Sequence, residues 1–317
     1  NSSTAEVSLI HQQIYKVALT EGPVSKLIFA TLMSLFFIYV NAIMFYTLLS
    51  KPVFKETPRY ILFNHMILND SIQLFVTALL YILGVAYIKV FMAGCAFTVI
   101  VSGATFRNAP LNLALMSLER YVAIRFPLRH AEIATQKRTY IAIGVMWFLG
   151  LVQYLIDLFY TILMDPTFLI SQKFCTREML FIKQWQVDLH KGVNIFFFVS
   201  VSTIILFTYI SILITTRSAI SSNKDSKAHK TVLLHLIQLS FCLTSFLYSI
   251  IAQAAAMASS NSSLFIELQY VTFLLMVILP RCLSPLIYGL RDNAIRPLFI
   301  YYFCCTTCKH KSKVNVQ

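Results

Sequence analysis

The stretch Met116–His130 reads MSLERYVAIRFPLRH and closes a long, mostly apolar segment that begins near Phe91. It places Glu119 directly before Arg120, so two opposite charges stand together where the hydrophobic pattern is about to stop. The apolar pattern resumes for a turn and then meets a proline and further basic residues. This arrangement is typical of a membrane-spanning helix that ends at the lipid–water boundary, where a charge costs much less than at the bilayer centre.

Composition places the 317-residue chain in the membrane class. Hydrophobic residues make up 58% of it and charged residues 12%, whereas a soluble domain carries roughly 25% charged residues. The net charge of +13 reflects basic residues at the ends of apolar segments, so we expect no nucleic-acid partner. The cysteines lack zinc-ligand spacing, and the sequence shows neither paired carboxylates nor a nucleophile with its base. It therefore predicts no enzyme, no metal and no cofactor.

Seven segments are apolar enough to cross a bilayer, which takes roughly 20 residues as a helix. They cover roughly Ser25–Leu49, Arg59–Gly84, Phe91–Arg125, Thr139–Met164, Leu189–Arg217, Lys230–Met257 and Leu264–Leu290. The connections are short except between the fourth and fifth segments, and no internal repeat is present. The sequence predicts an all-α, seven-transmembrane helix bundle over residues 25–290, an extracellular N-terminus of residues 1–24 and a cytoplasmic tail of residues 291–317.

The distribution of Lys and Arg orients this bundle, because cytoplasmic loops carry the excess of both residues. Most of them follow the first span, the third span, the fifth span and the seventh span. These connections are therefore expected in the cytoplasm, with the N-terminus outside. Two glycosylation sequons, at Asn1 and Asn261, fall on the predicted outer side. A third match, at Asn69, lies inside the second span, where it cannot be glycosylated.

The tail begins with residues 292–303, which read as a short amphipathic helix on the inner membrane surface. Its apolar face consists of Ile295, Leu298, Phe299, Tyr302 and Phe303. Cys304, Cys305 and Cys308 follow at once, and juxtamembrane cysteines are sites of palmitoylation. The alternative is that these cysteines are free thiols in the reducing cytosol.

Seven spans with an outer N-terminus resemble a G-protein-coupled receptor, and individual residues make the resemblance specific. The residues that match the rhodopsin-like (class A) pattern in order are Asn41, Asp70, Cys95, Glu119-Arg120-Tyr121, Trp147, Cys175 and Ser284-Pro285-Leu-Ile-Tyr288. This resemblance covers essentially the whole chain. It implies a receptor that binds a ligand within the bundle and acts on a heterotrimeric G protein.

Longer stretches are similar to odorant receptors. MSLERYVAIRFPLRH resembles their third-helix signature, residues 227–236 (KAHKTVLLHL) resemble the start of their sixth helix, and residues 280–292 (PRCLSPLIYGLRD) look most like fish odorant receptors. Cys175 is the only cysteine of the second outer loop, where tetrapod receptors usually have more. The aromatic switch of their sixth helix is also replaced near Cys242. Both departures argue against transferring tetrapod ligand rules to this chain.

The resemblance implies an odorant receptor of the plasma membrane, in the cilia of olfactory neurons, that binds a small extracellular molecule and activates the olfactory stimulatory G protein. One alternative is a non-olfactory class A chemosensory receptor. Another is a seven-helix ligand-gated channel or transporter. Transporters often show internal repeats and broken helices, which are not apparent here, and insect odorant channels have the opposite topology.

Two pairings follow from the resemblance and from where the residues fall. Cys95 and Cys175 both lie on the predicted outer side, where disulfides persist, so we expect a bridge rather than two unpaired thiols. Asp70 lies in mid-membrane, where the matching acid of many rhodopsin-like receptors binds sodium. Arg281 stands at about the same depth, so we expect a salt bridge between the two residues in place of a sodium site; alternatively, Arg281 pairs elsewhere.

An activation switch is expected around the opening stretch and in the seventh span. Glu119 would hold Arg120 in an intrahelical pair at rest, beside Tyr121, and release it on activation. Pro285 removes a backbone donor and would give a hinge near Tyr288. The predicted G-protein contacts are Arg120, Ile124, Pro127, Leu128, Arg217, Lys227 and Lys230.

Arg107 lies in the middle of the third span and allows two interpretations. It provides the counter-charge for an anionic ligand group, or it pairs with Asp157 or with backbone carbonyls for structural reasons. The pocket itself is expected between helices in the outer half of the bundle, although plain packing is the alternative for any single residue. Its candidates are Thr98, Ser102, Thr105, Phe106, Asn194, Phe198, Tyr248, Ala252, Gln253, Tyr270 and Phe273.

Overall fold

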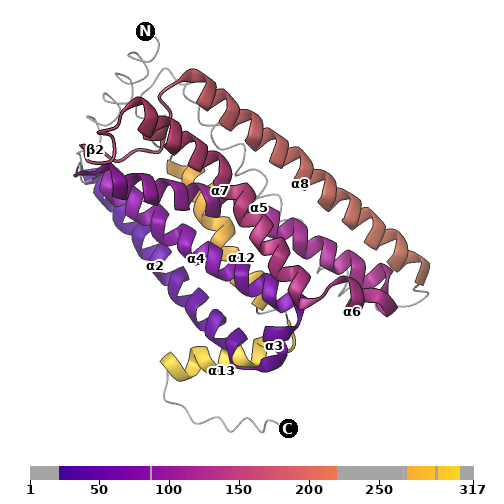
Figure 1. Ribbon diagram of the computed structural model, residues 1–317. Helices are drawn as coiled ribbons and strands as arrows, with labels where there is room; N and C mark the ends of the chain where they lie inside the picture. The colour runs from indigo at the N-terminus through magenta and orange to yellow at the C-terminus, as the bar shows by residue number, and fades with distance from the viewer. Residues whose placement is uncertain (1–20, 86–87, 220–266, 268–269, 290–291, 308–317) are drawn as a thin grey trace.

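The computed structural model describes residues 21–85, 88–219, 267, 270–289 and 292–307. Helices run alongside one another in this part of the chain (Figure 1). They are α2 (Glu21–Leu49), α4 (Pro58–Val85), α5 (Met92–Arg125), α7 (Gln136–Met164), α8 (Gln184–Ala219) and α12 (Leu279–Gly289). Short elements join them: α3 (Pro52–Glu56), β1 (Lys89–Phe91), η2 (Pro127–Arg129), α6 (His130–Ile133), β2 (Gln172–Phe174), η3 (Arg177–Leu180) and η4 (Leu274–Ile278). Helix α13 (Ile295–Thr307) lies across the end of the helices, near α3 (Figure 1).

Four helices of the described ranges are long and apolar enough to cross a membrane: Ser25–Leu49, Pro58–Gly84, Gln136–Met164 and Gln184–Thr215. They correspond to the first, second, fourth and fifth predicted spans. The third predicted span is helical as expected, but buried polar side chains such as Arg107, Asn108 and Asn112 interrupt its apolar character. The sixth predicted span lies outside the described residues, and the seventh is described only in part.

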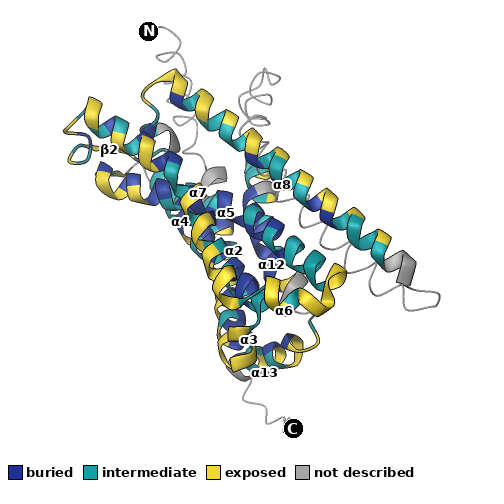
Figure 2. Ribbon diagram, turned by 45° about the vertical axis from the view of Figure 1, so that its right-hand side comes forward, coloured by how far each residue is buried: buried dark blue, intermediate teal, exposed yellow. Residues whose placement is uncertain are grey.

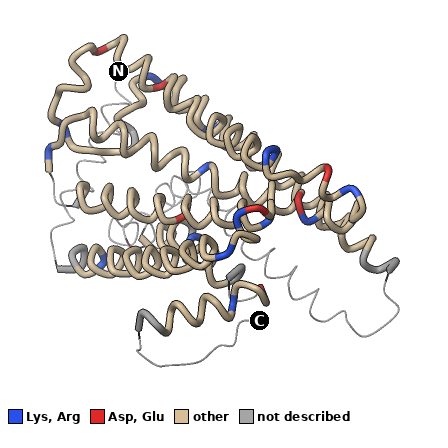
Figure 3. The backbone as a smooth tube through the Cα atoms, turned by 60° about the horizontal axis from the view of Figure 1, so that its bottom comes forward, with Lys and Arg blue, Asp and Glu red and all other residues tan. Residues whose placement is uncertain are grey.

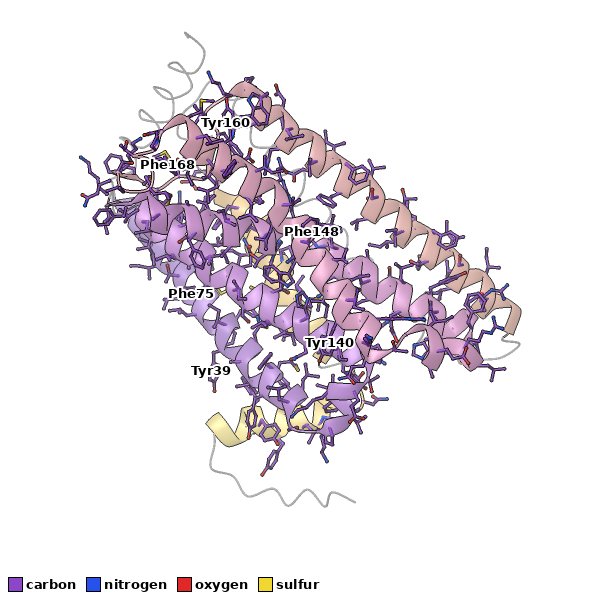
Figure 4. All side chains as sticks on the ribbon, in the orientation of Figure 1. Tyr39, Phe75, Tyr140, Phe148, Tyr160 and Phe168 are labelled. Atoms are coloured by element: carbon purple, nitrogen blue, oxygen red, sulfur yellow. A yellow bond between two sulfur atoms is a disulfide. The ribbon has the colours of Figure 1, made fainter. Side chains whose placement is uncertain are left out.

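Polar and apolar side chains are arranged as expected for a bundle in lipid. Large aromatic side chains point away from the helices, as Phe75 and Phe148 show with 59% and 65% of their surface exposed (Figure 4). Charged side chains such as Asp70, Arg107 and Arg281 are buried instead. Buried residues accordingly concentrate where the helices face one another (Figure 2).

Helix α5 lies at the centre and contacts α4, α7 and α8. Two glycines let α5 and α7 approach closely. Gly103 of α5 lies against the ring of Tyr154, where an added Cβ would overlap ring atoms, and Gly150 of α7 lies against Asn108, whose Oδ1 would be 2.7 Å from such a Cβ. Each helix therefore inserts a larger side chain over a glycine of the other, the small-residue contact by which membrane helices often pack.

The outer segment between α7 and α8 is held at two points, Cys175 near its middle and Leu180 near its end. A disulfide joins Cys95, at the start of α5, to Cys175, and the two Cα atoms are 5.5 Å apart. Strands β1 and β2 pair antiparallel beside it. Near its end, the Thr161 hydroxyl donates to the carbonyl oxygen of Leu180 (3.1 Å), and the Gln186 amide oxygen accepts from two backbone N–H groups before α8. These bonds start α8 at Gln184, five residues before the predicted Leu189.

The tail forms α13, which begins at Ile295 rather than near Asp292. Asp292 instead precedes the helix, where its Oδ1 accepts from the backbone N–H of Ala294 (2.9 Å) and its Oδ2 pairs with Arg59 of α4 (2.6 Å). Ile295 and Phe299 are buried in a cluster with residues of α2 and α4. The contact of α13 with the inner membrane surface stays a prediction.

The seventh predicted span departs from α-helical geometry just before Pro280. Residues Leu274–Ile278 form a π-helical turn, η4, and α12 follows from Leu279. Pro280 cannot donate a backbone hydrogen bond and its ring crowds the preceding turn, which is a common cause of such irregularities. Pro285 lies inside α12, so the hinge predicted near Tyr288 stays a prediction.

Candidate functional site

A polar cluster surrounds Arg107 at the contact of α5, α7 and α8. The guanidinium group is fully buried, and its Nη2 donates to Oε1 of Gln153 (2.5 Å). Its Nε donates to Oδ1 of Asn194 (3.2 Å). The Tyr154 ring lies against the guanidinium, with 4.6 Å between the ring centroid and Cζ. Arg107 is thus held by neutral groups of two neighbouring helices.

His190 of α8 completes this cluster, and its contact with Arg107 indicates which ring nitrogen accepts a hydrogen bond. Its Nδ1 is 3.2 Å from Nη2 of Arg107. A guanidinium only donates hydrogen bonds, so Nδ1 must be the acceptor and the imidazole is neutral, with its proton on Nε2. The His190 ring also packs against Tyr154, with 5.7 Å between ring centroids. The histidine therefore adds a dipole to the cluster but no charge.

Asp157 is the acidic residue that interacts electrostatically with Arg107 across this cluster. No Asp or Glu oxygen in the described part of the chain lies within salt-bridge distance of Arg107. Oδ1 of Asp157 accepts from Nε2 of Gln186 instead (3.1 Å). Asp157 therefore anchors the start of α8, and it does not neutralise the guanidinium through direct contact.

A second buried pair of charges lies between α4 and α12. Asp70 and Arg281 are both 1% exposed and interact electrostatically, and Asp70 also hydrogen-bonds to Ser284. The guanidinium of Arg281 lies over the Phe106 ring, 5.3 Å from its centroid. The two predicted partners therefore interact electrostatically, whereas their salt bridge and the replacement of a sodium site stay predictions.

A hydrogen-bonded chain crosses from α7 to α5 through α4. Trp147 Nε1 donates to Nε2 of His65 (2.8 Å), and Nδ1 of His65 lies 2.9 Å from Nδ2 of Asn112. Indole is only a donor, so Nε2 of His65 must accept. Nδ2 of Asn112 also donates to the carbonyl oxygen of Leu62 (3.2 Å), so the amide is held against α4 at two points. This chain ties the pattern residue Trp147 to α5.

The cytoplasmic end of α5 carries the predicted switch (Figure 3 shows the charged residues along the backbone). Oε1 of Glu119 lies 3.0 Å from Nε2 of His130, at the start of α6. The ring of Tyr121 packs against Phe207 of α8, with 5.6 Å between centroids. Glu119 thus contacts a residue beyond the end of α5. The Glu119–Arg120 lock stays a prediction, and His130 is a partner that the sequence did not reveal.

The described pocket candidates divide between two sides of the bundle. Asn194 joins the Arg107 cluster. The Thr105 hydroxyl donates to Gln73 of α4, the Tyr270 hydroxyl donates to the backbone of α2, and the Phe273 ring stacks on Tyr81 of α4. These three therefore contact α2 and α4 rather than α8. Ser102 and Thr98 are buried and Phe198 is half-buried; the Thr98 hydroxyl donates to a backbone carbonyl of its own helix.

Several predicted residues lie outside the described residues or have undescribed side chains. They are the pocket candidates Tyr248, Ala252 and Gln253; the switch residue Tyr288; the G-protein contacts Arg217, Lys227 and Lys230; the sequons at Asn1 and Asn261; and the cysteines Cys305 and Cys308. Cys304 is exposed at the end of α13. Acylation and glycosylation stay predictions.

Gln153 and Tyr154 were missed as site residues by the sequence reasoning. A signal was present, because Gln153, Asp157 and Thr161 recur every fourth residue in an otherwise apolar helix. Residues four apart lie on one helix face, and all three are buried. A polar stripe inside a membrane span marks the face that meets other helices.

Four apolar helices of the described residues are long enough to cross a membrane, and the sequence comparisons identify the class of membrane protein. Residues 28–288 match the family described as 7 transmembrane receptor (rhodopsin family). The chain belongs to this family. It is therefore a multi-pass receptor of the plasma membrane and not an enzyme.

The chain is similar to named olfactory proteins within that family. It is 34% identical to Odorant receptor 131-2 of Danio rerio, over 87% of this chain and 86% of that protein. It is 30% identical to Olfactory receptor 52A1 of Homo sapiens, over 61% of this chain and 62% of that protein. The expected resemblance to odorant receptors, and to a fish receptor in particular, is confirmed.

Proposed function

We propose that this chain is an odorant receptor that binds a small extracellular molecule among its helices and activates the olfactory stimulatory type of heterotrimeric G protein. Its similarity to Odorant receptor 131-2 of Danio rerio supports the olfactory assignment. Olfactory neuron cilia are then the expected location. The contact surface for the G protein is then the predicted residue set, namely Arg120, Ile124, Pro127, Leu128, Arg217, Lys227 and Lys230.

The observation that carries this proposal is an exposed apolar surface beyond the end of α5. Leu128 is 96% exposed in η2, and Ile124 and Phe126 are each 43% exposed beside it. Ile124 lies in the last turn of α5, and Phe126 and Leu128 follow it. All three are on the side where basic residues gather, so we place them in water rather than in lipid. Exposed apolar patches of this kind mark protein–protein contacts, and Pro127 directly precedes Leu128.

Replacing Leu128 with Asp tests the proposal in cells that express the receptor and the olfactory stimulatory G protein. Burial of a leucine stabilises a contact by about 1.5–3 kcal/mol. The cyclic-nucleotide response to an odorant mixture should therefore fall by roughly tenfold or more, at unchanged surface expression. Val53→Asp is the matched control, because Val53 is 63% exposed in α3 on the same predicted side but outside the proposed contact.

Two results would contradict the proposed function. An odorant response that survives Leu128→Asp unchanged would remove the proposed contact. An odorant-evoked ion current that persists when the G protein is inhibited would instead assign the chain to ligand-gated channels.

A further inference from the structure

We propose that the ligand carries an anionic group, a carboxylate or a sulfate ester, and that Arg107 and Gln153 bind it. This inference rests on the proposed function only in assuming that a small molecule binds within the bundle. It specifies the chemical class of that molecule. The site lies between α5, α7 and α8, apart from the Asp70–Arg281 pair.

The first argument is that Arg107 has no counter-ion in direct contact among the described residues. Its guanidinium donates there to three neutral acceptors: Oε1 of Gln153, Oδ1 of Asn194 and Nδ1 of His190. The group is 0% exposed. Asp157 acts on it electrostatically but lies beyond salt-bridge distance. A buried charge without a contacting counter-ion strongly destabilises a fold, and an ionisable residue within a membrane span is by default a functional site. An anion from outside would supply a counter-charge in direct contact.

The second argument is a pair of unused donors. Nη1 of Arg107 and Nε2 of Gln153 are both buried and have no hydrogen-bond partner among the described residues. The Gln153 atom that faces Arg107 must be the amide oxygen, because a guanidinium only donates hydrogen bonds. The nitrogen is then left without an acceptor. Two buried donors beside one positive charge match the two oxygens of a carboxylate or of a sulfate ester.

The third argument is orientation. The ring of Tyr154 lies 4.6 Å from Cζ of Arg107, and it is itself confined by Gly103 behind it. A planar guanidinium held against an aromatic face keeps its donor edge in one direction. The site is therefore organised before any ligand arrives, which reduces the entropy lost on binding.

Asp157 is the internal competitor for this guanidinium. Its Oδ1 is occupied by Gln186, and its Oδ2 has no partner among the described residues. A movement that brought Oδ2 onto Arg107 would neutralise the guanidinium without a ligand. The two possibilities predict opposite effects for Asp157→Asn. Removal of a competitor leaves anion binding equal or tighter, whereas removal of a structural partner destabilises the receptor and adds no binding.

The test measures thermal unfolding of the purified full-length receptor in detergent, so that it needs no G protein. The probes are sodium salts of linear aliphatic carboxylates, alkyl sulfates of matched chain length, and the corresponding methyl esters and alcohols. Ionic strength is held constant with sodium chloride. Carboxylates or sulfates should raise the unfolding temperature of the wild-type receptor where the neutral analogues do not. Arg107→Gln should weaken this effect roughly tenfold to a hundredfold, as loss of a charged hydrogen-bond donor does.

Gln153→Glu keeps the proposal testable if Arg107→Gln does not fold. It places a carboxylate directly against the guanidinium, so the ligand-free receptor should become more stable while the response to anions disappears. Lys173→Gln, on the exposed outer segment, is the charge-matched control and should leave the response unchanged.

Three outcomes would overturn the proposal: equal stabilisation by acids and their esters, equal stabilisation by sodium chloride alone at the same ionic strength, or an unaltered anion response in both Arg107→Gln and Gln153→Glu. Failure of the proposed function looks different. Anions would then stabilise the purified receptor through Arg107 while cells showed no G-protein response. A receptor that signals to neutral odorants but gains no stability from any anion would refute this inference alone.

Discussion

Gly103→Ala is expected to disturb the Arg107 cluster although Gly103 touches no charged group. The new Cβ would overlap Cζ, Oη and Cε2 of the Tyr154 ring, and the ring cannot retreat freely because only 6% of the residue is exposed. Overpacking of this kind costs about 1–3 kcal/mol. Moving the ring from under Arg107 forfeits a further 0.5–2 kcal/mol or so of cation–π attraction. We expect a loss of about 1.5–5 kcal/mol in total.

The assay is thermal unfolding of purified receptor, with Gly94→Ala as the control. Gly94 lies in the same helix, and a Cβ there would meet nothing within 4 Å, so Gly94→Ala should be neutral or slightly stabilising. Gly103→Ala should unfold several degrees lower. Tyr154→Leu removes the three overlapping atoms, so its combination with Gly103→Ala should be less destabilising than the sum of the two single changes. An unfolding temperature for Gly103→Ala equal to that of Gly94→Ala would refute the reasoning.

Three other expectations concern the ends of the helices. Glu119→Gln weakens the contact with His130 and should raise ligand-independent cyclic-nucleotide production, whereas unchanged basal signalling would count against a restraint at this position. Asp292→Asn removes the carboxylate that Arg59 of α4 contacts, so Cys304 near the end of α13 should label faster with a thiol reagent in intact membranes; equal rates would show that this ion pair does not hold α13. Just after α7, the hydroxyl and the backbone N–H of Thr167 both donate to Oδ1 of Asp165. The hydroxyl bond holds the pKa of Asp165 below its usual range. The turn that these bonds form is therefore most stable above the pKa of an unfolded aspartate and weakens as pH falls through the lowered value. The carboxyl resonance of Asp165 should therefore titrate at higher pH in Thr167→Val, and an unchanged midpoint would show that Thr167 is not the cause.

The lengths of the apolar segments in the sequence predicted the ends of the four membrane-spanning helices in the described residues to within a few residues. Span boundaries differ where a side chain extends a helix, as Gln186 does by accepting two backbone hydrogen bonds ahead of the predicted start of α8. The π turn before Pro280 was not predicted. The sequence shows that a proline lacks a backbone hydrogen-bond donor, but it does not show which neighbouring turn of the helix changes its hydrogen-bond pattern as a result.

The disulfide could be predicted because only two cysteines fall on the predicted outer side. The interaction of Asp70 with Arg281 could be predicted because the two charged residues lie at about the same depth in the membrane. Partners across helices were harder to predict. Whether Thr105 faces α4 or a ligand depends on the rotation of α5 about its axis, which one sequence fixes only loosely. The neighbours of Arg107 depend on how closely α5 and α7 approach, and that distance is set by Gly103 and Gly150.

The double fastening of the outer segment has a kinetic consequence. The segment is joined to α5 by the disulfide at Cys175 and to α7 by hydrogen bonds at Leu180 and Gln186. For a ligand bound beneath it, as proposed above, a segment held at two points cannot swing aside as a hinged flap, so the ligand would leave through smaller fluctuations between side chains. Reduction of the disulfide should therefore shorten the residence time of such a ligand, because dissociation is where changes in affinity usually appear.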